Sequence, residues 1–135
     1  MSKVIARIKM IKNFLIINCI GKDDKLALRI NKDFFFHKLK NKDNNNKLVL
    51  EIFKFLKKNN VFLDNKFTVI VNQGPGSFSG VRLSIAIAKG LMISKNIKLY
   101  GFNNADLKKF DQKNIEIMLN KHLIEKNLIK PIYLS

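Results

Sequence analysis

The segment from Val69 to Ala88 limits the possible folds of this chain more than any other feature. A β-branched run over 66–72 leads into Gly74-Pro75-Gly76, and a long helix is expected over 79–94. Gly74 and Gly76 permit backbone angles that are closed to other residues, and Pro75 stiffens the turn between them. A strand joined by a tight turn to a helix is the repeating unit of α/β sheets, so an α/β fold is expected.

The rest of the 135-residue chain predicts a single sheet with helices on both of its faces. The predicted elements follow the order β-β-β-α-β-α-β-α, with strands over 13–20, 25–30, 34–39, 66–72 and 98–102 and helices over 46–58, 79–94 and 114–126. The third strand is expected near an edge of the sheet. Three meander strands followed by crossovers imply a mixed five-stranded sheet. Ribonuclease-H-like and actin-like ATPase lobes share this topology, which alone does not name a function.

Three segments are expected along the chain. Residues 1–12 form an N-terminal extension, residues 13–110 the lobe, and residues 111–135 a C-terminal helix and tail. The first dozen residues mix charge throughout and lack the apolar core of a secretory signal, and Met10 is an alternative start. No apolar stretch reaches the roughly 18 residues of a membrane span, so a cytoplasmic protein without a membrane partner is expected.

The composition is strongly basic, with a formal net charge of +16. Such a charge attracts polyanions such as RNA. Nearly all of the basic residues are Lys, since Arg occurs only at positions 7, 29 and 82, and a codon bias is the alternative explanation.

Cys19 is the single cysteine, which excludes an intrachain disulfide and predicts a small buried core residue.

The glycine-rich turn has two physical interpretations. Ser77 or Ser79 can cap the free amides at the start of the helix, which gives a purely structural turn. The same amides and the helix dipole also favour an anion, which gives a phosphate-binding turn. The Walker pattern fails because Val81 and Arg82 follow Gly80, and the dinucleotide pattern fails because Ser79 stands where its third glycine is required.

The helix over 79–94 carries apolar or small groups around nearly its whole circumference. Such a helix requires burial on all sides, while a sheet covers only one of them. The helix over 46–58 has a similarly broad apolar face, and the two are expected side by side. An exposed patch of this kind usually marks a protein interface, unless the C-terminal helices fold over it. The predicted interface residues are Ile52, Phe55, Val81, Leu83, Ser84, Ala86, Ile87, Ala88 and Leu91.

The same segment resembles the signature of the TsaB (YeaZ) family. That signature is GPGSF[TS]G[LV]R, followed by a helix of small residues with KG near its end. Weaker similarity extends to the strand at 14–20, to 101–104 and to the tail at 131–134. The matching residues are Gly74, Pro75, Gly76, Ser77, Phe78, Ser79, Gly80, Val81 and Arg82, followed by Ala86, Ala88, Lys89, Gly90 and Leu91.

The resemblance implies a degenerate, non-catalytic actin-like ATPase fold. Members of the family pair with a larger homologue, the TsaD transferase, through helices beside the signature, and a TsaE-type ATPase joins them. The assembly places threonylcarbamoyl on the adenosine next to the tRNA anticodon. The resemblance therefore implies a partner subunit without cofactor or metal that meets tRNA indirectly or weakly. Self-pairing is the expected alternative when the partner is absent.

The chain departs from the family pattern in three places. Family members usually exceed 200 residues and have two lobes, so the second lobe is expected to be largely missing. Asn18-Cys19 replaces the usual Asp-Thr/Ser at the end of the first strand, which removes a phosphate or magnesium contact. His37 and His122 do not form the partner's metal-binding pair. The competing hypothesis is a nucleotide- or anion-binding enzyme module that uses the glycine-rich turn.

Overall fold

The computed structural model describes residues 11–40, 45–126 and 129–133. Their strands form one mixed sheet in the order β3-β2-β1-β4-β5-β6. β4 pairs in parallel with β1 and with β5, and the other pairings are antiparallel. The strands are β1 (Phe14–Asn18), β2 (Lys25–Ile30), β3 (Asp33–Lys38), β4 (Thr68–Asn72), β5 (Lys98–Phe102) and β6 (Ile124–Glu125).

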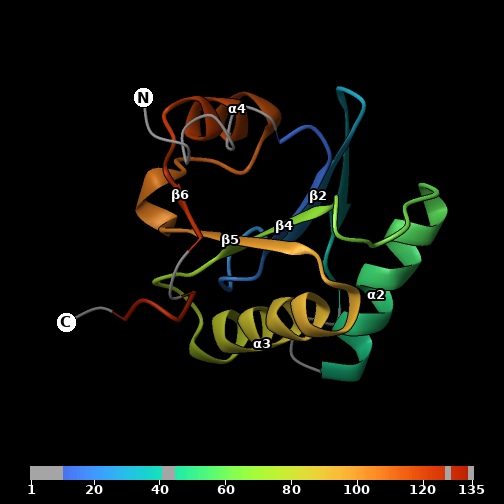
Figure 1. The fold of residues 1–135 in the computed structure, drawn as a ribbon. Helices are drawn as coiled ribbons and strands as arrows, with labels where there is room; N and C mark the ends of the chain where they lie inside the picture. The colour runs from blue at the N-terminus through green and yellow to red at the C-terminus, as the bar shows by residue number, and fades with distance from the viewer. Residues whose placement is uncertain (1–10, 41–44, 127–128, 134–135) are drawn as a thin grey trace.

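Helices cover both faces of this sheet (Figure 1). α2 (Asn45–Lys58) and α3 (Phe78–Lys95) lie side by side on one face. The shorter α4 (Gln112–Asn120) packs on the other face, after the single-turn 3-10 helix η1 (Asn104–Asp106). The expected mixed sheet with helices on both faces is confirmed.

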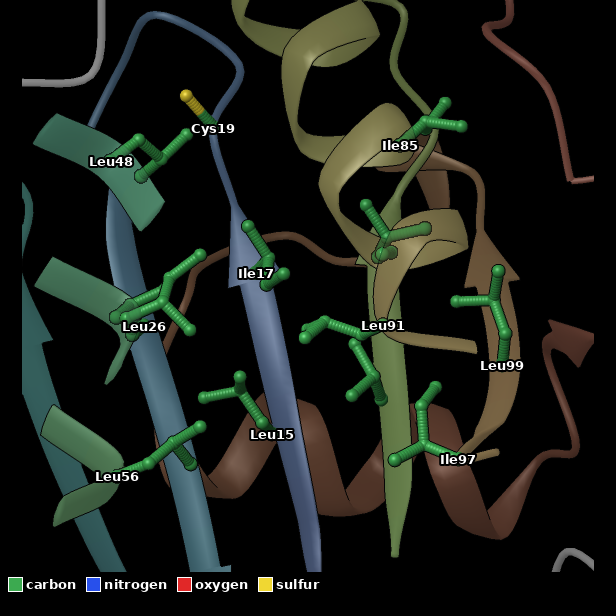
Figure 2. Close-up of a cluster of buried hydrophobic side chains, with 14 of the residues drawn as sticks. Leu15, Ile17, Cys19, Leu26, Leu48, Leu56, Ile85, Leu91, Ile97 and Leu99 are labelled. Atoms are coloured by element: carbon green, nitrogen blue, oxygen red, sulfur yellow. The ribbon is translucent and has the colours of Figure 1, made fainter. Parts of the chain in front are cut away.

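Strand alternation divides the core into two clusters. Leu15 and Ile17 of β1 point toward α2 and α3, whereas Phe14 and Ile16 point toward α4. Figure 2 shows the first cluster, in which Cys19 packs among side chains of the strands and of both helices. β1 and β4 are buried on both faces, as their continuous apolar runs predicted. β3 is the edge strand that the sequence indicated.

The C-terminal region differs from the sequence prediction in one respect. The helix expected over 114–126 ends at Asn120, and the two-residue strand β6 follows it. His122 adopts the left-handed conformation with φ of 58°, which stops the helix. Ile124 then pairs with Phe102 and is buried in the second core cluster, so the sheet has six strands instead of five.

The position of α4 shows whether the C-terminal helix covers the broad apolar sides of α2 and α3 or leaves them exposed. Ile115 and Met118 of α4 pack against the face of the sheet opposite α2 and α3. The C-terminal helix therefore does not cover the α2–α3 pair. In the described part of the chain, no helix combines the length and the apolar character that crossing a bilayer requires. Residues 1–10 of the expected extension, including the alternative start Met10, lie outside the described residues.

Candidate functional site

The glycine-rich turn packs directly against the end of β1. A Cβ atom added at Gly76 would lie 2.7 Å from Ile20 Cβ, and one added at Gly80 would lie 2.7 Å from the carbonyl oxygen of Cys19. Contacts this short exclude a side chain, because neither neighbour is the end of a flexible group. Gly74 has a φ of 89°, a conformation that L residues rarely adopt. The sequence spacing of these glycines therefore follows from close packing within the chain.

Hydrogen bonds within the chain engage several amides of the turn. The amide of Ser77 donates to the carbonyl of Ile20 at 2.7 Å, and the Ser77 hydroxyl accepts from the amide of Gly80 at 3.3 Å. The amide of Gly74 donates to Asn72 Oδ1 at 2.9 Å. Ser77 is thus the helix cap, one of the two serines that the sequence proposed. A phosphate-binding turn needs such amides free, and these three already have partners.

The C-terminal tail also anchors the turn. The amide of Ile132 donates to the carbonyl of Gln73 at 2.8 Å, and Gln73 Nε2 donates to the carbonyl of Lys130 at 3.0 Å. On the outer side of the turn, the Arg82 guanidinium lies 4.9 Å from the ring centre of Phe78, whose centre is 5.8 Å from that of Tyr133. Phe78 and Tyr133 stay exposed, so the turn presents an aromatic surface with one cation.

Three asparagine side chains meet at the carboxyl ends of β1 and β4. Asn72 Nδ2 donates to Asn18 Oδ1 at 2.7 Å and to Asn104 Oδ1 at 3.1 Å. Asn18 and Asn72 are almost fully buried. Asn18 stands where the sequence comparison expected an acidic residue, and its amide oxygen is used by Asn72. This part of the structure is a neutral hydrogen-bonded network.

A groove runs between α2 and α3 on the face that α4 leaves uncovered. Its volume is about 330 Å³, and most of its lining is apolar or small. The two helices also carry exposed apolar side chains, with Leu50 of α2 at 55% and Ile93 of α3 at 82%. The residues that line the groove are Val49, Phe53, Ala86, Ile87, Gly90, Leu91 and Ser94.

A family model described as "TsaD: tRNA N6-adenosine threonylcarbamoyltransferase" matches residues 38–108, just over half of the chain. A curated relative, the "tRNA threonylcarbamoyladenosine biosynthesis protein TsaB" of Buchnera aphidicola subsp. Baizongia pistaciae (strain Bp), is 44% identical over 46 residues. That match covers 34% of this chain and 21% of the relative. The chain belongs to the family that this model describes, and within that family to the TsaB (YeaZ) group.

Two solved structures have the same fold as part of this chain. "YeaZ from Pseudomonas aeruginosa" superposes with a TM-score of 0.58 at 18% identity and covers 68% of this chain and 44% of its own. A second structure, titled as an uncharacterized protein with similarity to peptidase YEAZ from Pseudomonas aeruginosa, gives 0.60 at 19% identity, covering 68% and 43%. The chain thus spans under half of these YeaZ structures. The fold is the expected actin-like, ribonuclease-H-like lobe.

The predicted interface of this TsaB-group chain divides into two sets in the structure. Six of the nine residues are buried in the chain's own core, and of these six only Leu91 also lines the groove. The other three, Leu83, Ala86 and Ile87, retain accessible surface on α3. The buried six are Ile52, Phe55, Val81, Ser84, Ala88 and Leu91.

The predicted interface residues did not include Val49 and Phe53 of α2, which line the groove, whereas the sequence did mark Gly90 of α3 as a small residue that lets another helix approach. A Cβ atom added at Gly90 would meet nothing within 4 Å, so the chain's own packing does not require a glycine there. The spacing contained the signal, because Val49 and Phe53 lie four residues apart, as do Ala86 and Gly90. Residues with this spacing share one side of a helix.

Proposed function

We propose that this chain is a non-catalytic partner subunit in the biosynthesis of threonylcarbamoyladenosine on tRNA. In this proposal it binds a TsaD-type transferase through the docking face, defined as the groove between α2 and α3 together with the exposed apolar side chains of these two helices. The observation that carries the proposal is that α4, the third α-helix among the described residues, packs on the opposite face of the sheet and leaves this apolar face uncovered. The family resemblance extends the proposal to a TsaE-type ATPase and to tRNA reached through the transferase.

The apolar content of the docking face supports a protein partner. Phe53 lines the groove and is exposed, and Leu50 of α2 and Ile93 of α3 are exposed as well. Burial of apolar surface contributes roughly 25 cal/mol per Å². A contiguous patch that no part of the described chain buries is typical of interaction sites.

Gly90 gives a second, independent argument. A glycine inside a helix costs roughly 0.5–1 kcal/mol relative to alanine. Since nothing in the described part of the chain lies within 4 Å of an added Cβ, close packing among the described residues does not explain this cost. Together with the neighbouring Ala86, which is exposed, Gly90 lets another helix approach the α3 backbone closely. The cost is explained if a partner occupies that space.

Two features of the carboxyl edge of the sheet support a subunit without chemistry of its own. The amides of Gly74, Ser77 and Gly80 are engaged within the chain. Asn18, which accepts a hydrogen bond from Asn72, stands in place of an acidic residue that could hold a metal ion. Both features stabilise the lobe and leave the TsaD-type partner to supply the catalytic groups.

Co-expression with an affinity-tagged TsaD-type protein tests the proposal. We expect the unmodified chain to co-purify and Ala86→Arg to abolish co-purification, because the arginine would enter the groove. Ala105→Arg is the matched control, since Ala105 is exposed on η1, away from α2 and α3. Retention of both variants by the partner would refute the docking face.

A nucleotide- or anion-binding module is the second candidate, and one observation favours it. A hollow of about 270 Å³ beside Asn18 and Asn104 is lined by three lysines and one carboxylate, those of Lys22, Lys108, Lys109 and Asp23. Calorimetry of the isolated chain with ATP separates the two candidates. Micromolar binding that is lost in Lys108→Ala would favour the module, and its absence would favour the partner subunit.

A further inference from the structure

A basic hollow lies on the face of the sheet opposite the docking face. Its volume is about 650 Å³, and it is lined by residues at the amino ends of β1, β4 and β5. Thr68 pairs with Lys98, and Ile70 with Tyr100, so these side chains follow one another on the α4 side of the sheet. The lining residues are Ile11, Lys12, Asn13, Lys66, Thr68, Lys98, Tyr100 and Lys126.

Four of the eight described lining residues are lysines, and they come from four separate segments. Lys12 precedes β1, Lys66 precedes β4, Lys98 begins β5 and Lys126 follows β6. All four are exposed, and none forms an ion pair with a carboxylate among the described residues.

Among the described residues, no Asp or Glu lines the hollow. Four ammonium groups around one concavity repel one another and create a positive potential, which a multiply charged anion would neutralise.

An exposed aromatic ring lies in a neighbouring hollow that also includes Lys66. A second hollow of about 280 Å³ shares Asn13 and Lys66 with the basic hollow, and Phe62 is part of its lining. The side chain of Phe62 is 88% exposed, so the core does not hold it. One carboxylate is present here, that of Asp64, which accepts a hydrogen bond from the Lys66 amide at 2.9 Å.

We propose that the basic hollow and Phe62 together bind a single-stranded nucleic acid. The four lysines contact successive phosphates of its backbone, and the Phe62 ring stacks on a base. Proteins that bind single strands combine such a basic groove with exposed aromatic rings. Lysine acts as a point charge and lacks the bidentate fork that reads guanine, so little sequence discrimination is expected.

The shape of the site favours a nucleic-acid strand over an acidic membrane. The lysines surround a concave hollow on the molecule's surface, which fits a narrow chain that can bend into it. A flat bilayer would meet mainly the rim. The inference does not rest on the transferase assignment, since the basic hollow and the docking face lie on opposite faces of the sheet.

Fluorescence anisotropy of the full chain with a labelled single-stranded RNA oligonucleotide tests the proposal. We expect Lys66→Glu/Lys98→Glu to lose at least about tenfold in affinity and to lower the salt slope by about one per lysine. The matched control is Lys54→Glu/Lys57→Glu on the exposed side of α2, which changes the net charge equally. We expect a loss of less than about threefold for the control, because its lysines lie outside the hollow.

Phe62→Ala separates stacking from charge. A stacked base contributes about 1–3 kcal/mol, so we expect a loss of at least about fivefold with the salt slope unchanged. Equal losses in the two double variants would overturn the proposal, because binding would then follow net charge alone. Binding to anionic phosphatidylserine vesicles in preference to the RNA would also overturn it. Co-purification with the TsaD-type protein should be unaffected by Lys66→Glu/Lys98→Glu and by Phe62→Ala, whose positions lie outside α2 and α3, which keeps the two proposals separately testable.

Discussion

Gly80 and Gly90 lie ten residues apart on α3, and their surroundings are opposite. An added Cβ at Gly80 would lie 2.7 Å from a backbone oxygen of Cys19 and 3.1 Å from its sulfur. An added Cβ at Gly90 would meet nothing within 4 Å. Other described atoms of the chain therefore pack closely against Gly80 at the amino-terminal end of α3, which we call the closed end. No described atom packs against an added Cβ at Gly90, and this side of the carboxyl half is called the open flank.

The two ends of the signature therefore have different roles, one in packing within the chain and the other at the docking face. The residues from Gly74 to Gly80 let the turn pack against β1, the tail and the region after β5. The small residues Ala86 and Gly90 leave room on the docking face. Substitutions at the closed end should therefore change the stability of the isolated chain, whereas those on the open flank should change partner binding.

The largest effect on stability is expected for Asn72→Asp at the closed end. The Asn72 amide group donates to two side-chain oxygens, and a carboxylate of the same shape would instead place negative oxygens against them. We expect the free energy of unfolding to fall by about 3 kcal/mol or more, measured by urea denaturation. Asn65→Asp at an exposed position is the control and should change it by less than about 0.5 kcal/mol.

A smaller loss is expected for Gly80→Ala. The new methyl group would overlap the carbonyl of Cys19 and force the turn away from β1. Overpacking of this kind costs typically about 1–3 kcal/mol, which chemical denaturation would detect. Unchanged stability would mean that the turn is loosely packed and that the closed end does not exist as described.

The smallest effect on the free energy of unfolding is expected for Gly90→Ala, and it is a gain in stability instead of a loss. Gly90→Ala removes a flexible residue from a helix and meets no steric obstacle. We expect the isolated chain to gain about 0.5–1 kcal/mol in the free energy of unfolding, and its affinity for the TsaD-type partner to fall. A gain in stability with unchanged affinity would show that the space beside Gly90 is not used by a partner.

Most of the fold could be predicted from local sequence. The β-branched runs that form β1 and β4 and the alternation of β2 need only nearest-neighbour patterns. The strand β6 could not be predicted, because it depends on the left-handed His122 and on pairing between Ile124 and Phe102, which are distant in sequence. The hydrogen bond from Ile132 to Gln73 is of the same long-range kind.

The candidate site was harder to predict than the fold. The helix α3 is apolar or small on nearly all sides, so its composition did not mark the side that faces the core. Ser84 and Ala88 are buried, while Met92 and Ile93 are exposed, which reverses what hydrophobicity alone would suggest. The basic hollow was equally hidden, because its lysines lie in four segments of a chain that is rich in Lys throughout.

The most direct test of the docking face is site-specific thiol labelling. Cys19, the chain's own cysteine, is only 1% exposed, so a cysteine introduced at Ala86 or at Ala105 would be the accessible thiol. With a saturating TsaD-type protein, we predict that labelling at Ala86→Cys slows by about tenfold or more, since a contact there excludes reagent and water. Labelling at Ala105→Cys should keep its rate. Equal, unchanged rates at both positions in a complex that has formed would contradict the account.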